Sequence, residues 1–168
     1  MIYIPRRLER FAHEGGAAGG PSGQGGSMNR EEIVLTALSA GGAGAWYEPV
    51  QVQKLFFLID REIAADVGGH HFVFRPYDYG PFDSDVYTEL ERMHRSGLAV
   101  IAAGYYRSYG LSEQGYARGV ALLNKLPARA RDYMTRTARW VLSLSFSQLV
   151  SAIYEKYPDM KTASVFRQ

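Results

Sequence analysis

Apolar residues recur at intervals of three and four along most of the chain, which is the spacing that places them on one face of an α-helix. The first such segment begins near Asn29 and ends at the glycine-rich stretch 41–44. The second begins at Pro49 and stays apolar on several sides until the glycine pair 68–69. It therefore predicts a central helix that is packed on more than one side.

The pattern changes between residues 71 and 82, where β-branched and aromatic side chains are interrupted by prolines and glycine. This composition predicts a short strand and an ordered turn, in which Gly80 adopts a backbone angle that other residues resist. Pro81 is expected to preset the entry to the following helix. That helix is predicted to have Asp83 as its N-cap and to end at Gly97.

Residues 98–102 and 105–111 flank a short Ala103-Gly104 turn, which predicts a two-stranded ribbon. Ser145 and Gln148 have the spacing of a capping box and predict a helix start. The last three helices are expected over residues 112–127, 128–144 and 146–157.

The order of these elements is that of a winged-helix-like unit. We therefore predict a mostly α domain of the α+β class with a small two- or three-stranded β element. The 168 residues, 46% of them hydrophobic, suffice for one core. Because residues 15–26 contain seven glycines, we expect residues 1–27 to be a flexible glycine-rich extension and residues 28–168 to form a single globular helical domain.

Composition narrows the function classes. The chain has no cysteine, which excludes disulfides, thiol nucleophiles and thiolate metal sites and fits a cytoplasmic location. The net charge of +2 is too small to demand a polyanionic partner. No apolar segment approaches the roughly 20 residues that span a bilayer, so no membrane partner is expected.

Motifs of catalysis and of metal binding are missing from the sequence. The adjacent His70 and His71 would point to opposite faces of a strand, and Asp83 and Asp85 fit the first turn of a helix, where the dipole favours negative charge. Neither a nucleophile elbow nor a phosphate-binding loop occurs. We therefore expect no enzymatic activity, no metal and no cofactor.

The segment from Tyr77 to Phe82 is the most distinctive part of the sequence, because three aromatic residues, a carboxylate, glycine and proline adjoin each other. In one interpretation, Tyr79 and Phe82 attach the turn to the core while Asp78 bonds local amides. In the other, the segment is an aromatic edge that binds a partner, because tyrosine offers a large contact area at a low entropy cost. The two interpretations are compatible.

Basic residues concentrate between residues 118 and 139, which contain six basic side chains and a single acidic one. Arg129, Arg136 and Arg139 can share a helix face and are candidate polyanion-binding residues, although a solvated helix face remains the default explanation. A nucleic-acid-binding regulator is therefore the alternative function, with a wing formed by Tyr105, Tyr106 and Arg107. Against it, the helix after residue 83 has acidic residues in its N-terminal half, which would repel a DNA backbone.

Three segments resemble the Panacea antitoxin family, which includes proteolytic-adaptor antitoxins of bacteria and phage-associated proteins. They are Val50 to Leu58 with its Lys54-Leu55-Phe56 core, Asp78 to Phe82 with the helix that follows, and Tyr109 to Gly115. The resemblance implies a bacterial, prophage-associated, non-enzymatic antitoxin that neutralises a cognate toxin protein by direct binding. A protease adaptor complex is a further partner that it implies.

The predicted function is thus that of a protein-interaction module. Its predicted partner-binding patch consists of Lys54, Tyr77, Asp78, Tyr79 and Phe82.

Overall fold

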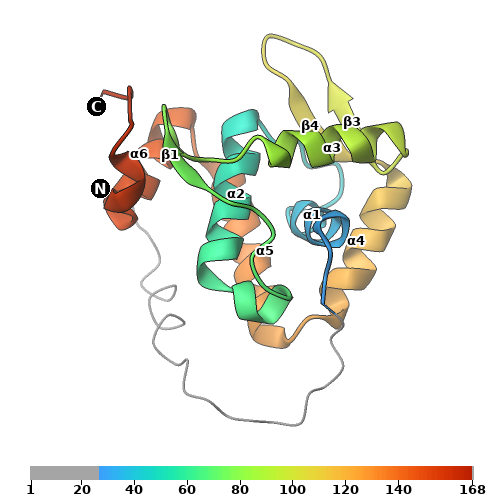
Figure 1. The fold of residues 1–168 in the computed structure, drawn as a ribbon. Helices are drawn as coiled ribbons and strands as arrows, with labels where there is room; N and C mark the ends of the chain where they lie inside the picture. Colours follow the sequence, from blue (N-terminus) through green and yellow to red (C-terminus); the bar gives the residue numbers. More distant parts are fainter. Residues whose placement is uncertain (1–26, 168) are drawn as a thin grey trace, which may run out of the picture.

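The computed structural model describes residues 27–167, so the predicted extension over residues 1–27 lies outside it except for Ser27. The described chain is mostly helical, with two short antiparallel strand pairs (Figure 1). The helices are α1 (Arg30–Ser39), α2 (Pro49–Glu62), α3 (Asp85–Arg95), α4 (Glu113–Lys125), α5 (Ala128–Ser143) and α6 (Phe146–Lys156), with short 3-10 helices η2 (Ala64–Val67) and η3 (Pro158–Lys161). The strands are β1 (Arg75–Tyr77), β2 (Gly80–Phe82), β3 (Ala99–Ala102) and β4 (Ser108–Leu111).

Helix α2 lies at the centre of the molecule and packs against α5, α6 and α1 (Figure 1). Ten consecutive residues, 51–60, are buried, as the sequence predicts for a helix that is enclosed on several sides. Three of the buried residues near its N-terminal end are polar: Gln51, Gln53 and Lys54. A helix that is buried all round carries its polar side chains into the interior, where each needs a hydrogen-bond partner.

Helices α1 and α4 approach each other closely because α4 presents glycine to the contact. A Cβ atom at Gly119 would lie 2.3 Å from the carbonyl oxygen of Leu35, and one at Gly115 would lie 2.0 Å from that of Leu98. Any larger residue would separate the backbones. The two glycines therefore fix the position of α4 against α1 and against the start of the β3–β4 ribbon.

The strands form two separate antiparallel pairs, so the small β element of the predicted fold class is divided between two hairpins. Segment 71–82 does not join the ribbon; it forms its own hairpin, in which Pro76 pairs with Pro81. Pro81 thus lies in β2 and does not open α3. In the ribbon, β3 pairs with β4, and residues 103–107 form the connecting loop, so Tyr105 lies outside the strand predicted for it.

An isolated bridge between Tyr47 and Tyr109 extends the ribbon, with both backbone hydrogen bonds at 2.8 Å. The order is then α1, bridge, α2, α3, β3 and β4, with the β1–β2 hairpin inserted between α2 and α3. This is a winged-helix-like order, and the predicted mostly α, α+β class is confirmed.

The predicted helix caps are largely correct. The Ser112 side chain accepts a hydrogen bond from the third amide of α4, and Ser145 forms the predicted capping box at the start of α6. The N-cap predicted for α3, Asp83, is one residue too early. Ser84 occupies the N-cap position and makes no side-chain cap bond. The Asp83 carboxylate instead accepts from the amide of Asp85 at 2.9 Å, so the acid still satisfies a first-turn donor.

Candidate functional site

A groove of about 700 Å³ lies where several elements of the described chain meet. The N-terminal half of α2, the β1–β2 hairpin, the first turn of α3 and the first turn of α6 all contribute to it, together with the tip of the β3–β4 ribbon. Its lining residues are Glu48, Pro49, Val50, Gln53, Lys54, Tyr77, Asp78, Tyr79, Gly80, Phe82, Tyr87, Tyr106, Ser145 and Phe146.

The hairpin shapes the groove because its turn is tight and its backbone lies directly on α2. Tyr77 pairs with Gly80, so only Asp78 and Tyr79 form the turn. Gly80 has a φ of 99°, which confirms the prediction that glycine is needed here. A Cβ atom at Gly80 would come within 3.3 Å of the Tyr154 ring and 3.5 Å of Cε of Lys54.

Lys54 is buried beneath this hairpin, with 3% of its surface exposed, and it still lines the groove. Its Nζ donates a hydrogen bond to the carbonyl oxygen of Pro81 at 3.1 Å. Burial lowers the pKa of the Lys54 amine to about 7, since removal from water disfavours the charged form. Lys54 takes part in none of the ion pairs formed within residues 27–167.

Gln53 of α2 binds the residue that joins the hairpin to α3. Its side-chain amide donates to the carbonyl oxygen of Asp83 at 2.9 Å and accepts from the amide of Asp83 at 3.0 Å. The Asp83 carboxylate in turn accepts from the amide of Val73 at 2.7 Å. This network satisfies the buried polar groups beside Lys54 and makes the groove a preformed feature.

Aromatic rings border the groove in two series. In the first, Tyr77 stacks on Phe82 with ring centroids 5.0 Å apart, and Phe82 contacts Tyr87 at 5.9 Å. In the second, Tyr79 meets Phe146 edge to face at 5.0 Å. Tyr77, Tyr79 and Phe146 are 53%, 44% and 38% exposed, so the rings remain accessible for contact with another molecule.

The C-terminal segment supports the hairpin from outside the groove. The amide of Val165 donates to the carbonyl oxygen of Asp78 at 3.0 Å, and the hydroxyl of Tyr154 donates to Ser164 at 2.6 Å. Phe166 contacts the ring of Phe146 at 6.2 Å. The amino-acid sequence does not predict this contact, because residues 162–167 have no periodic pattern of their own.

The five residues of the predicted patch all line this one groove: Lys54, Tyr77, Asp78, Tyr79 and Phe82. Tyr77 and Tyr79 are exposed, Asp78 and Phe82 are half-buried, and Lys54 is buried. Their role in binding a partner stays a prediction. Phe146 was missed because its helix is distant in sequence and only the fold brings it to the hairpin. Tyr87 was missed although α3 follows the hairpin directly, because its position in the helical pattern does not show that it lines the groove.

The predicted basic stripe lies on α5, but two of its three arginines are engaged. Arg129 pairs with Asp66 at 2.9 Å and Arg136 pairs with Asp132 at 3.1 Å. Arg139 is exposed. These pairs reduce the positive charge that the stripe offers to a polyanion.

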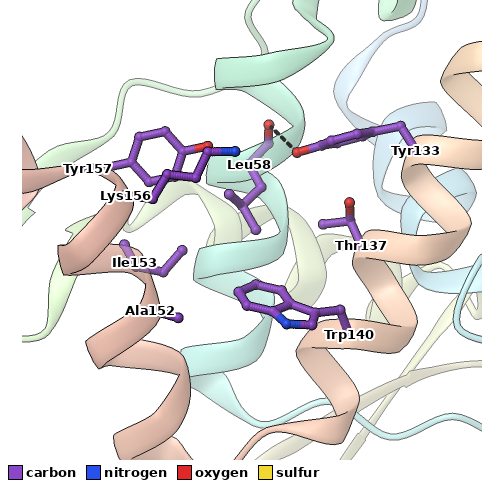
Figure 2. Close-up of a pocket in the computed structure, with 8 residues that line it drawn as sticks. All are labelled: Leu58, Tyr133, Thr137, Trp140, Ala152, Ile153, Lys156 and Tyr157. Carbon is purple, nitrogen blue, oxygen red and sulfur yellow. Dashed lines mark hydrogen bonds between the residues drawn. The ribbon is translucent and has the colours of Figure 1, made fainter. Parts of the chain in front are cut away.

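A second, much smaller cavity of about 20 Å³ lies between α2, α5 and α6, bordered by Leu58, Trp140 and Ile153 (Figure 2). It has room for about one water molecule and none for a metabolite. The hydroxyl of Thr137 faces this part of the core without a hydrogen-bond partner among the described residues. We regard the cavity as a packing feature of the core.

Chemically, the groove offers apolar contact and one buried amine. A neutral lysine amine is a nucleophile, but Nζ of Lys54 already donates to the carbonyl oxygen of Pro81, and we assign it no covalent chemistry. Within residues 27–167, no cluster of three or more histidine or acidic side chains has the geometry to hold a metal ion.

Fold and groove together define a winged-helix-like domain with an inserted hairpin and an aromatic groove. No protein-family model matches the chain, and no curated protein or solved structure is significantly similar to it. None of the described helices combines the length and the apolar character that a membrane span requires. The resemblance to the Panacea antitoxin family therefore stays a prediction.

Proposed function

We propose that this chain is a non-enzymatic protein-interaction module that acts as an antitoxin and neutralises a cognate toxin by direct binding. The observation that carries the proposal is the gathering of accessible aromatic rings around one preformed groove. Tyr77, Tyr79 and Phe146 line the groove, and each is more than a third exposed. Tyrosine and phenylalanine are among the residues enriched in protein interfaces, and tyrosine is a frequent hot spot.

The rigidity of the groove favours tight association. Gln53 fixes one end of the hairpin and the segment around Val165 fixes its tip. A surface that is already ordered loses little conformational entropy when a partner binds, so more of the contact energy contributes to affinity.

The resemblance to Panacea antitoxins adds the biological setting to this proposal. It favours a cytoplasmic bacterial protein that is associated with a prophage and encoded beside its toxin. In some members of that family the antitoxin is a proteolytic adaptor, so a protease adaptor complex is a second proposed partner.

A nucleic-acid-binding regulator is the second candidate, and one observation favours it. At the tip of the β3–β4 ribbon, Tyr105 and Tyr106 are 93% and 65% exposed, as in a wing that contacts a nucleic acid. Against it, Arg107 beside them pairs with Glu91 of α3 at 3.1 Å. Binding to duplex DNA that weakens steeply with added salt would support this candidate over the antitoxin.

Co-expression with the product of the neighbouring gene tests the antitoxin proposal. We expect the two proteins to co-purify and the chain to restore growth of cells that express the neighbouring gene alone. The double variant Tyr79→Ala/Phe146→Ala should lose both effects, because it removes the two rings of one wall of the groove.

Trp46→Ala is the matched control for this experiment. Trp46 is 48% exposed, close to the value for Tyr79, but it does not line the groove. Equal neutralisation by the parent, the control and the double variant would contradict the proposal.

A further inference from the structure

Lys54 has hydrogen-bonding capacity that the described chain does not use. An ammonium group carries three donors, and the one recorded hydrogen bond of Nζ goes to the carbonyl oxygen of Pro81. A buried cation normally has a paired carboxylate, because its removal from water is otherwise uncompensated. The groove therefore contains one buried amine that has no anionic partner in the part of the chain that the structure describes.

The acidic residues that line the groove do not supply that partner. Glu48 and Asp78 both lie in the lining, and neither forms an ion pair with Lys54. The carbonyl oxygen of Asp78 is bonded to the amide of Val165, which fixes the turn. The depressed pKa of the Lys54 amine agrees with this arrangement, because an adjacent carboxylate would favour the charged form.

The surroundings of the amine specify the rest of the ligand. Titratable groups reach the groove from every element around it, and apart from Lys54 they are carboxylates and phenols. They are Glu48 from the start of α2, Tyr77, Asp78 and Tyr79 from the hairpin, Tyr87 from α3, Tyr106 from the ribbon tip and, beneath Gly80, Tyr154 from α6. Among residues 27–167, Lys54 is thus the one cation in an otherwise aromatic and acidic lining.

We propose that the occupant of the groove is a partner-protein segment that places one aspartate or glutamate carboxylate on Nζ of Lys54 and packs apolar residues beside it against Tyr79 and Phe146. The positive charge of Lys54 selects the acidic side chain, and the rings select its apolar neighbours. A charge-assisted bond shielded from water is strong and directional. This inference rests on the proposed function and specifies the chemistry of the segment that binds.

The same geometry predicts proton uptake on binding. In the free protein, the amine is divided between its neutral and charged forms near pH 7. A bound carboxylate favours the charged form, so the complex takes up part of a proton. Segments that bind only through the rings would cause no such uptake.

A displayed library of random 12-residue peptides is the probe. We expect selection on the full chain to enrich one aspartate or glutamate flanked by apolar residues, and the Tyr79→Ala variant to lose these peptides while Trp46→Ala keeps them. A synthetic copy of an enriched peptide should bind about tenfold or more weakly when its acid is changed to the matching amide. On Lys54→Met, the acid and the amide peptides should bind alike.

Calorimetry of the acid peptide at pH 7.5, in two buffers of different ionisation enthalpy, should show proton uptake by the parent and none by Lys54→Met. Peptides that need Tyr79 but show no acidic preference would overturn this inference and leave the groove as a docking site. Failure to select any peptide that depends on Tyr79 would overturn the inference and count against the proposed function as well. The acid-to-amide comparison is made on the parent protein, so it does not depend on how Lys54→Met folds.

Discussion

The buried amine of Lys54 makes the stability of the protein depend on pH in a defined direction. Its pKa is about 7 in the folded state, whereas the ordinary value, which applies to the unfolded chain, is 10.5. Between these two values the unfolded chain binds more protons than the folded one. The free energy of unfolding therefore rises with pH in this window, and at lower pH the cost of charging the buried amine opposes folding.

The magnitude follows from the two pKa values. Each pH unit inside the window adds up to about 1.4 kcal/mol for one group. Because the folded amine is still about half protonated at pH 7, we expect a gain of about 2 kcal/mol between pH 7 and pH 9. Urea denaturation at several pH values, followed by circular dichroism, measures this gain directly.

Lys54→Met is the matched variant, because methionine preserves the unbranched apolar stem and removes the titrating group. Its free energy of unfolding should lack the Lys54 contribution, so the difference between parent and variant should change by about 2 kcal/mol over the same range. Parallel pH profiles for the two proteins would show that the amine titrates normally. The placement of Lys54 in a dry site beneath the hairpin would then be wrong.

Three further substitutions test the packing around the site by chemical denaturation. Gly119→Ala should destabilise the protein by about 2 kcal/mol or more, because its Cβ would overlap the carbonyl oxygen of Leu35. An unchanged free energy of unfolding would contradict the close contact of α1 with α4. Thr137→Val should stabilise it by about 1 kcal/mol, since it removes a buried hydroxyl that lacks a hydrogen-bond partner among the described residues. A lower free energy of unfolding in the variant would instead indicate that the hydroxyl forms a hydrogen bond. Gly80→Ala should destabilise it by roughly 1–2 kcal/mol, because alanine resists a φ of 99°. It should also shift the NMR signals of the Tyr154 ring, because the added Cβ would lie 3.3 Å from that ring. Unchanged signals would contradict the described turn.

The sequence predicted the helices well because their signals are local. Apolar spacing and caps such as Ser112 and Ser145 depend on residues within one or two turns, and the structure confirms them. The turn at Gly80 was also predictable, because positive φ strongly favours glycine. The same locality explains why the residues of the hairpin were identified together as one patch.

The rest depended on contacts between distant segments. Short apolar runs do not specify which strands pair with each other. The sequence therefore could not show whether segment 71–82 pairs with the ribbon or forms its own hairpin. Gln53 and Asp83 are 30 residues apart, and each is unremarkable alone. Gly119 looks like a weak point in a helix until the backbone of α1 is placed against it.

The most direct test of the groove as the binding site is amide hydrogen exchange, measured on the chain alone and in complex with the product of the neighbouring gene. The account predicts that binding slows exchange in the hairpin, residues 75–82, and at the first turn of α6. Protection confined to the β3–β4 ribbon or to α5, with the hairpin unchanged, would contradict it.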